Sequence, residues 1–402
     1  MTGVHDMDAN DEVVIVAAKR TAIGRFGGSL GSVPATELGA RCIVGCLDDA
    51  GLDPAHVDEV IMGNVITAGS GQNPARQASL SAGLSNATCA FTINKVCGSG
   101  LKAVQLGWQA VRCGDADIVI AGGMENMSSA PYVIPKARWG ARMGHMQAVD
   151  TMLHDGLWDI FGDYHMGVTA ENLAERFDVT REDQDGFACE SQKRAGMAIA
   201  SGRFLEEIVP VEVRVKRRSV TFDVDEHPRP DVTREDLSKM RPAFSDDGTV
   251  TAGNASGIND GGAALVIASR ERAEGLGLPV LCALRGFAAA GCDPAYMGLG
   301  PVLASRKLLE RQKQDIDGID LIESNEAFAV QALVVLRELG LDPAQVNVNG
   351  GAIALGHPIG ASGARILVTL VHEMARRGSR RGLATTCIGG GQGISAYVER
   401  GG

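Results

Sequence analysis

The amino-acid sequence predicts an α/β protein with two similar halves and a segment of different character inserted between them. Short runs rich in valine and isoleucine alternate with amphipathic stretches of helical length. Parallel strands that helices cover on both faces produce this alternation. A set of strand and helix patterns that starts at residue 58 returns from residue 318 onward. A change of composition between the two sets marks the inserted segment.

The first elements follow from hydrophobic periodicity. Residues 13–18 and 59–64 have the pattern of buried strands, and residues 36–50 and 74–82 have that of amphipathic helices. Asn73 stands directly before a proline, which is typical of an N-cap residue followed by proline in the first helical turn. The sequence therefore predicts that this helix begins at residue 74.

An internal repeat defines the two halves. The strand at 58–64 has an acidic start and a terminal Asn, and the strand at 318–325 has the same features. A helix opened by Ser99-Gly leads into a second strand, as does a helix opened by Ser362-Gly, and a glycine pair follows both strands. Because the matches occur in the same order, we expect two related α/β units.

The segment between the halves, from about residue 128 to 251, differs in composition. Met, His, Trp and Tyr become frequent, and charged stretches replace the regular alternation. We interpret this segment as an inserted loop domain. Its basic run at 214–218 is interpreted as a solvated strand face, with a phosphate site as the alternative.

Length and charge limit the possible function classes. A chain of 402 residues, of which 45% are hydrophobic, can form more than one packed core, so we expect two or three domains. The net charge of -11 disfavours a nucleic-acid partner, because neutralising phosphates needs concentrated Lys and Arg. A local basic site for a small anionic ligand is compatible with this charge.

Cysteine usage and hydropathy indicate the compartment. The nine cysteines are odd in number and include no Cys-x-x-Cys pair, so reduced thiols are the simpler interpretation. Residues 1–11 are polar and acidic, unlike a signal or transit peptide. No run of about 18 apolar residues occurs. We expect a cytoplasmic protein without a membrane span.

The most informative cysteine is Cys97. Residues 92–104 have the pattern of a strand, a sharp turn and a helix, which places Cys97 at a helix N-terminus. Free N–H groups and the helix dipole stabilise a thiolate at such a position. We expect Gly98 and Gly100 to leave space for a substrate carbonyl beside the backbone. The alternative is a buried cysteine that acts as a small hydrophobic residue.

Two further residues suggest proton transfer. His357 lies in a glycine-rich loop just before a helix, where it has little to pack on, so a base that approaches a substrate is the better explanation. Cys387 stands at the end of a strand and precedes three glycines. A thiol whose pKa lies near 8.5 can act as an acid or base when its surroundings shift that pKa modestly.

These motifs carry a resemblance to a known family. Four motifs occur in the order found in thiolases: Val96-Cys97-Gly98-Ser99-Gly100, Asn325-Glu326-Ala327-Phe328-Ala329, Gly356-His357-Pro358 and Cys387-Ile388-Gly389-Gly390. The chain resembles the thiolase family from about residue 13 to its C-terminal end. The resemblance implies the thiolase fold, in which two similar βαβαβαββ halves pack in a five-layer α-β-α-β-α arrangement with an inserted loop domain.

The resemblance also implies domain boundaries. We expect the N-terminal thiolase half at 1–127 and 252–277. The loop domain, which binds coenzyme A in the family, is expected at 128–251. The C-terminal half is expected at 278–402.

The resemblance implies a role for each motif. Cys97 is similar to the nucleophile that accepts an acetyl group, and His357 to the base that activates it. Cys387 would remove a proton from the methyl group of a second acetyl-CoA. The N–H groups of Cys97 and Gly389 would bind the acyl-enzyme oxygen. His357 and a water held by Asn325 would stabilise the enolate oxygen.

Substrate contacts are also implied by resemblance. Ser256 is similar to a residue that bonds the pantetheine of coenzyme A, Arg229 to one at its adenine and phosphate end, and His165 to a further coenzyme A contact. Three residues resemble those that wall the acyl pocket of short-chain members: Leu157, Met166 and Met297. The expected ligands are acetyl-CoA, acetoacetyl-CoA and CoA. No metal and no permanently bound cofactor are expected, and the family suggests a homotetramer, a dimer of dimers.

Several alternatives remain at the level of sequence. A degradative 3-ketoacyl-CoA thiolase of broader chain length is the nearest, although the Val-Cys-Gly-Ser-Gly motif looks like the acetoacetyl-CoA group. A ketoacyl synthase would pair its cysteine with two histidines, or a His and an Asn, and lacks the Cys-x-Gly-Gly ending. A non-catalytic lipid-binding relative tends to lose the catalytic set. Asn325 has the alternative role of N-cap for a helix expected at 326–339.

Overall fold

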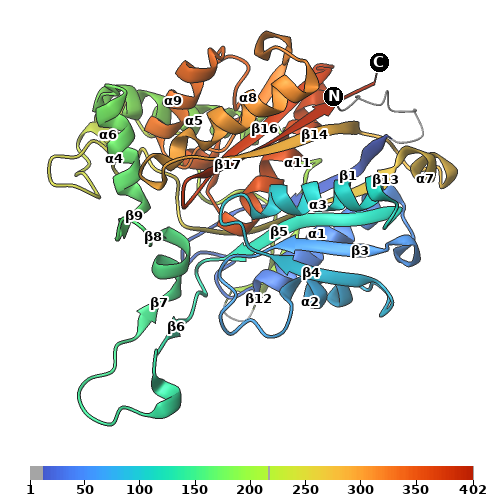
Figure 1. The fold of residues 1–402 in the computed structure, drawn as a ribbon, viewed down its shortest axis with the longest axis horizontal. Coiled ribbons are helices and arrows are strands. Elements are labelled where there is room, and N and C mark those ends of the chain that lie inside the picture. The colour runs from blue at the N-terminus through green and yellow to red at the C-terminus, as the bar shows by residue number, and fades with distance from the viewer. Residues whose placement is uncertain (1–11, 216–217, 402) are drawn as a thin grey trace, which may run out of the picture.

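The computed structural model describes residues 12–215 and 218–401. Its first half follows the order strand, helix, strand, helix, strand, helix, strand, strand (Figure 1). The elements are β1 (Val13–Thr21), α1 (Ala35–Ala50), β3 (Glu59–Gly63), α2 (Pro74–Ser81), β4 (Cys89–Ile93), α3 (Ser99–Cys113), β5 (Ile118–Asn126) and β13 (Asn259–Ser269). The predicted N-cap is confirmed, because the Asn73 side chain accepts a hydrogen bond from the Arg76 N–H.

The second half repeats the order of the first. Its elements are β14 (Cys282–Gly291), α8 (Gly300–Gln312), β15 (Leu321–Ser324), α9 (Ala329–Leu339), α10 (Ala352–Leu355), α11 (Ile359–Arg377), β16 (Arg381–Ile388) and β17 (Gln392–Glu399). The strand between α9 and α11 is reduced to a single bridge between Ile322 and Val346. The helix α7 (Arg270–Gly275) connects the halves.

Five layers result from the packing of the two halves. The strand order is β4-β3-β5-β13-β1 in the first half and β14-β17-β16-β15 in the second, and β1 pairs with β14 where they meet. The helices α3 and α11 lie between the sheets and share one apolar core with both. In Figure 1, α1 and α2 cover the outer face of the first sheet, and α8 and α9 cover that of the second. The predicted thiolase fold is confirmed.

Glycines allow the central helices to approach closely. A β-carbon on Gly100 would lie 2.7 Å from the backbone nitrogen of Ala364, and one on Gly363 would lie 2.6 Å from that of Leu101. Only glycine fits at such distances. A β-carbon on Gly98 would lie 2.5 Å from the end of the flexible Ile388 side chain on β16. Gly100 is therefore needed for helix packing, and the expectation that Gly98 and Gly100 make room for substrate stays a prediction.

The inserted segment is more regular than its composition suggested. Its elements are β6 (Tyr132–Val133), β7 (Val149–Asp150), β8 (Trp158–Asp159), β9 (Tyr164–His165), α4 (Met166–Arg176), α5 (Arg181–Ala200), β10 (Ile208–Val209), β11 (Val211–Val215), β12 (Arg218–Phe222) and α6 (Arg234–Ser238), and β2 (Gly24–Arg25) precedes it in the chain. Arg214 and Arg218 are exposed on a two-stranded hairpin, which confirms the solvated-face interpretation for them. Residues 216–217 of the basic run lie outside the described residues.

Buried charges attach the inserted segment to β1. The guanidinium of Arg20 donates to both carboxylate oxygens of Asp225, at 2.7 and 2.9 Å, and to Glu207 at 2.6 Å. All three side chains are buried, and removing one partner from such a cluster leaves an unpaired buried charge. The strand β10 adds to this attachment by pairing in parallel with β1. No helix within 12–215 or 218–401 has the length and apolar character that crossing a membrane requires.

Candidate active site

Strand ends bring the motif residues together. The strand β4 runs parallel to β3 and leads into the turn that holds Cys97. The strand β15 runs parallel to β16 and leads directly into Asn325, whose N–H donates to the Thr385 carbonyl at 2.9 Å. Cys387 is the penultimate residue of β16. Ligands bind beyond the carboxyl ends of parallel strands in many α/β proteins, and these segments border one cavity here.

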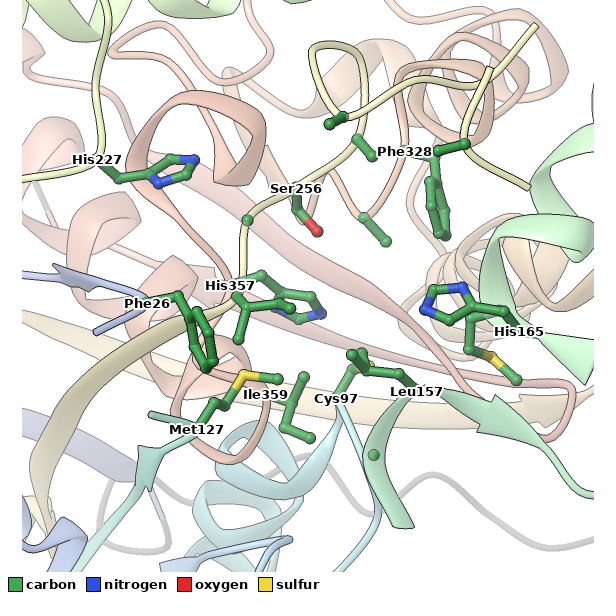
Figure 2. A pocket seen from close by; sticks show the side chains of 18 of the residues that line it. Phe26, Cys97, Met127, Leu157, His165, His227, Ser256, Phe328, His357 and Ile359 are labelled. Carbon is green, nitrogen blue, oxygen red and sulfur yellow. The ribbon is translucent and has the colours of Figure 1, made fainter. Parts of the chain in front are cut away.

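The cavity has a volume of about 630 Å³. All but two of the sequence-predicted site residues line it: Cys97, His357, Gly389, Ser256, Arg229, His165, Leu157, Met166 and Met297. In Figure 2, the side chains of His357 and Cys97 lie between Phe26 and Met127 on one side and Leu157 and His165 on the other. The cavity therefore joins residues from both halves and from the inserted segment.

Cys97 is half-buried at this cavity, two residues before α3 begins. Burial raises the pKa of its thiol to about 11, although backbone N–H groups of Gly389 and of Cys97 itself donate to the sulfur and lower that pKa. Burial thus opposes the stabilisation of a thiolate that was expected from the helix N-terminus, and that expectation stays a prediction. The sulfur needs a base to become a nucleophile.

His357 is held as a neutral imidazole with a free lone pair. Its Nδ1 lies 2.6 Å from Oγ of Ser362, and that hydroxyl lies 2.9 Å from the Pro358 carbonyl. The hydroxyl has one proton and donates it to the carbonyl, so Nδ1 must donate to Ser362. Burial, with a smaller effect of the Arg365 charge, lowers the pKa of His357 to about 3. The Nε2 atom is therefore an unprotonated acceptor at neutral pH.

The backbone around His357 is fixed from the first half. Its N–H donates to Oδ1 of Asn259 at 2.9 Å. The preceding Gly356 has a φ of +109°, and a β-carbon there would lie 2.5 Å from the Asn259 side chain. Gly356 therefore allows the backbone conformation and the close approach to Asn259 that fix the position of His357.

Asn325 and Cys387 lie behind the cavity wall. The Asn325 amide nitrogen is 3.5 Å from Nε2 of His357, and its buried Oδ1 has no hydrogen-bond partner among residues 12–215 and 218–401. The helix α9 begins only at Ala329, so Asn325 does not cap it and the capping alternative was wrong. Burial, and then the nearby charge of Cys97, raise the pKa of the Cys387 thiol well above its ordinary value. Cys387 packs with cavity-lining Met166.

Hydrogen bonds fix the segments expected to hold coenzyme A. The Ser256 N–H donates to the Ala327 carbonyl at 2.9 Å, which fixes the Ser256 loop to the loop after Asn325. Nδ1 of His165 accepts from the Gly167 N–H at 3.0 Å, so the neutral ring carries its proton on Nε2. Burial lowers the pKa of His165, which favours this neutral form.

Two family models together cover nearly the whole chain. The model "Thiolase, N-terminal domain" matches residues 13–271, and "Thiolase, C-terminal domain" matches residues 278–400. The chain belongs to the thiolase family. The domain boundaries expected above stay a prediction.

This thiolase is similar to characterised and solved relatives over almost its full length. It is 60% identical to the acetyl-CoA acetyltransferase of Pseudomonas aeruginosa, over 97% of this chain and 99% of the relative. The crystal structure of the Bacillus anthracis acetyl-CoA acetyltransferase matches with a TM-score of 0.95 and 46% identity, over 96% and 98% of the two chains. Human mitochondrial 3-ketoacyl-CoA thiolase matches with a TM-score of 0.95 and 43% identity, over 97% and 99%.

Several residues at the thiolase cavity were missed by sequence reasoning. His227 lines it two residues before Arg229, and burial followed by the Arg229 charge lowers its pKa to about 4. Phe244 lines it too, and its ring stacks on His165 with centroids 4.6 Å apart. Phe328 belongs to the quoted Asn-Glu-Ala-Phe-Ala motif, so its position could have been inferred. No sequence signal marks His227 or Phe244, and the stacking partner of Phe244, His165, is distant in the chain.

Proposed function

We propose that this thiolase is an acetyl-CoA C-acetyltransferase. It joins two acetyl-CoA molecules into acetoacetyl-CoA and CoA, and it catalyses the reverse thiolysis. The observation that carries the proposal is the meeting, at one cavity, of the Cys97 thiol, a neutral His357 and the N–H groups of Cys97 and Gly389. The name of the Pseudomonas aeruginosa relative supports the same activity.

The first half-reaction forms an acetyl-enzyme. Nε2 of His357 accepts the Cys97 proton, and the sulfur attacks the thioester carbonyl of acetyl-CoA. The N–H groups of Cys97 and Gly389, which lower the pKa of the Cys97 thiol, stabilise the developing oxyanion. The sulfur–carbon bond to CoA then breaks. Cys387, which burial keeps protonated, gives its proton to the leaving CoA thiolate.

The second half-reaction forms the carbon–carbon bond. Cys387 is now a thiolate and takes a proton from the methyl group of a second acetyl-CoA. The enolate oxygen is stabilised by His357 and by a water held by Asn325, and the carbanion attacks the acetyl group on Cys97. The Cys97 sulfur leaves and recovers its proton from His357. Both thiols thereby return to their starting protonation state.

The inserted segment and the Ser256 loop that follows it provide the proposed contacts to coenzyme A. Arg229 is exposed at the cavity, where its guanidinium would meet the phosphate and adenine end. The proton on Nε2 of His165 and the hydroxyl of Ser256 are available to the pantetheine chain. We assign coenzyme A binding to the loop domain at 128–251, inserted in an N-terminal half at 1–127 and 252–277, with the C-terminal half at 278–402.

The length of the acyl chain that the enzyme accepts distinguishes the two nearest candidate activities. The fold matches a 3-ketoacyl-CoA thiolase as well as an acetyl-CoA acetyltransferase, so the fold alone does not distinguish them. The test compares thiolysis of acetoacetyl-CoA with that of a C8 3-ketoacyl-CoA, using Cys97→Ser as the inactive control. We expect strong preference for acetoacetyl-CoA. Equal or faster cleavage of the C8 substrate would favour the degradative alternative, and no cleavage of either would favour a lipid-binding protein.

We propose a homotetramer in the cytoplasm. The loop between β6 and β7, residues 134–148, exposes Trp139 and Met143 at 82% and 96% of their surface. Exposed apolar side chains that lie together are typical of an interaction surface. Figure 1 shows this loop extending away from the two sheets. All nine cysteines are free, which supports a reducing compartment. Light scattering of the purified protein at micromolar concentration tests the assembly: four times the 42.0 kDa chain mass is expected, and a monomer overturns it.

A further inference from the structure

The residue before the nucleophile has an unusual backbone conformation. Val96 has a φ of +46°, in the left-handed region. Across residues 12–215 and 218–401, the other non-glycine residues with positive φ are Asn, Asp or Lys, so Val96 is the one β-branched member. A β-branched residue at positive φ is a true outlier, and such strain collects at functional sites.

Local hydrogen bonds hold Val96 in this conformation. Its N–H donates to Oδ1 of Asn94 at 2.9 Å, and its carbonyl accepts from the Ser99 N–H at 3.0 Å and from the Ser99 hydroxyl at 2.7 Å. The Ser99 hydroxyl oxygen also accepts from the Lys95 N–H at 2.8 Å. The turn is therefore fixed by contacts of its own residues on both sides of Val96.

A glycine would adopt this backbone without strain, so the valine side chain must supply something that glycine lacks. That side chain lines the cavity beside Cys97. Gly389 has no β-carbon, and one built there would lie 3.5 Å from Cγ1 of Val96, so the Val96 side chain lies on the face of Gly389 from which a side chain would project. Val96 thus belongs to the Cys97 turn and faces Gly389, and the N–H groups of Cys97 and Gly389 are the two that lower the pKa of the Cys97 thiol.

We propose that Val96 is a positioning residue for the oxyanion donors. Its branched side chain sets the spacing between the Cys97 turn and the Gly389 turn, so that both N–H groups converge on the carbonyl oxygen of the acetyl group. This inference rests on the proposed acetyl transfer. It explains why the chain keeps a strained valine at a position where glycine would be free of strain.

The test separates oxyanion stabilisation from thiol reactivity. Acetyl transfer from acetyl-CoA to Cys97 passes through an oxyanion, whereas alkylation of the same thiol by iodoacetamide does not. Val96→Ala removes the spacer, and Val96→Thr keeps the branched shape. Val348→Ala is the matched control, because Val348 packs partly buried against the same apolar core as Val96 but does not line the cavity.

We expect Val96→Ala to slow single-turnover acetylation of Cys97 by about 10- to 100-fold. Removing one oxyanion donor lowers a rate by about 10² to 10³, and displacing a donor should have a smaller effect. Because the same N–H groups also favour the Cys97 thiolate, alkylation of Val96→Ala should slow as well, but by clearly less than acetylation does. Val96→Thr should recover most of the acetylation rate, and Val348→Ala should lose thermal stability without slowing acetylation.

Three results would overturn the inference. Acetylation of Val96→Ala at the wild-type rate would show that the spacing does not depend on Val96. Equal losses in acetylation and alkylation would show displacement of the thiol rather than of the donors. A wild-type protein that forms no acetyl adduct would refute the proposed function, and this inference with it. If the wild type is acetylated and Val96→Ala is acetylated equally fast, only the role of Val96 is refuted.

Discussion

The side-chain amide nitrogen of Asn325 lies 3.5 Å from Nε2 of His357, at the one imidazole nitrogen that carries a lone pair. The other side-chain polar atom of Asn325, Oδ1, is buried and makes no hydrogen bond within the part of the chain that the structure describes. A buried polar atom without a partner is costly unless a ligand or water uses it. Asn325 therefore has a capacity for hydrogen bonding that the fold itself does not consume.

Asn325→Ala should reduce turnover strongly with little loss of stability. The substitution removes the group proposed to hold the water that stabilises the enolate, and loss of one such donor lowers the rate by about 10² to 10³. Steady-state condensation and thermal unfolding would be measured on the same preparation.

The matched control for Asn325→Ala is Asn73→Ala. Asn73 is a true N-cap, so its removal should cost about 1 kcal/mol of stability and leave turnover unchanged. If Asn325→Ala behaved like Asn73→Ala, with lower stability and full activity, the proposed role of Asn325 would be wrong.

Much of the site was predictable because its motifs lie at strand and helix ends. Local signals place Cys97 before α3 and Cys387 at the end of β16. The internal repeat then indicates that equivalent ends belong to two similar units. The thiolase resemblance adds residues such as Ser256 and His165, which line the cavity although no local pattern marks them.

Features set by burial and long-range packing were not predictable. The sequence favoured a thiolate at Cys97, but burial raises its pKa to about 11. The sequence also suggested that Gly100 leaves space for the substrate, but Gly100 is needed for the contact of α3 with α11. Both features depend on residues distant in the chain: Ala364 approaches Gly100, and Cys97 packs against a cluster formed by Val65, Ile66, Met127, Met152 and Ile359. A local pattern carries no information about these partners.

Ser362→Ala should impair catalysis by releasing the orientation of His357. Without the hydroxyl, Nδ1–H loses its acceptor at 2.6 Å, and the proton can move to Nε2, which removes the base. Loss of a partner that orients a catalytic group lowers activity by about 10- to 100-fold. Single-turnover acetylation of Cys97 would be measured. Ser305→Ala, which removes another buried hydroxyl, is the control and should acetylate at the wild-type rate.

Alkylation of Cys97 should rise steadily with pH in the absence of substrate. Below a pKa of about 11, the thiolate fraction increases about tenfold for each pH unit. The rate of iodoacetamide labelling should therefore climb from pH 7 to 9 without a plateau, as followed by peptide mass spectrometry. Exposed Cys113 in the same digest reports on the reagent. A plateau near pH 8 would contradict the conclusion that burial raises the pKa of the Cys97 thiol, and it would show that the helix N-terminus stabilises the thiolate.

The most discriminating substitution is Cys387→Ala, because the two thiols are assigned to different half-reactions. In this variant the Cys97 nucleophile, its base and both oxyanion donors remain. Acetyl-CoA should therefore still acetylate the enzyme, more slowly because Cys387 no longer protonates the leaving CoA. Intact-protein mass spectrometry should show one acetyl adduct, and peptide mapping should place it on Cys97.

The condensation step should then stop. Cys387 is fully buried against the cavity wall, and no other thiol is assigned to the substrate methyl group. Acetoacetyl-CoA production should fall by about three orders of magnitude or more, as expected when a proton-transfer group worth about 10² to 10⁴ is lost. Wild-type enzyme should exchange deuterium into the methyl group of acetyl-CoA, and the variant should not. If the variant still exchanges deuterium and condenses at the wild-type rate, Cys387 is only a packed strand-end thiol. The proton transfer would then belong to His357, whose unprotonated Nε2 is the nearest remaining base.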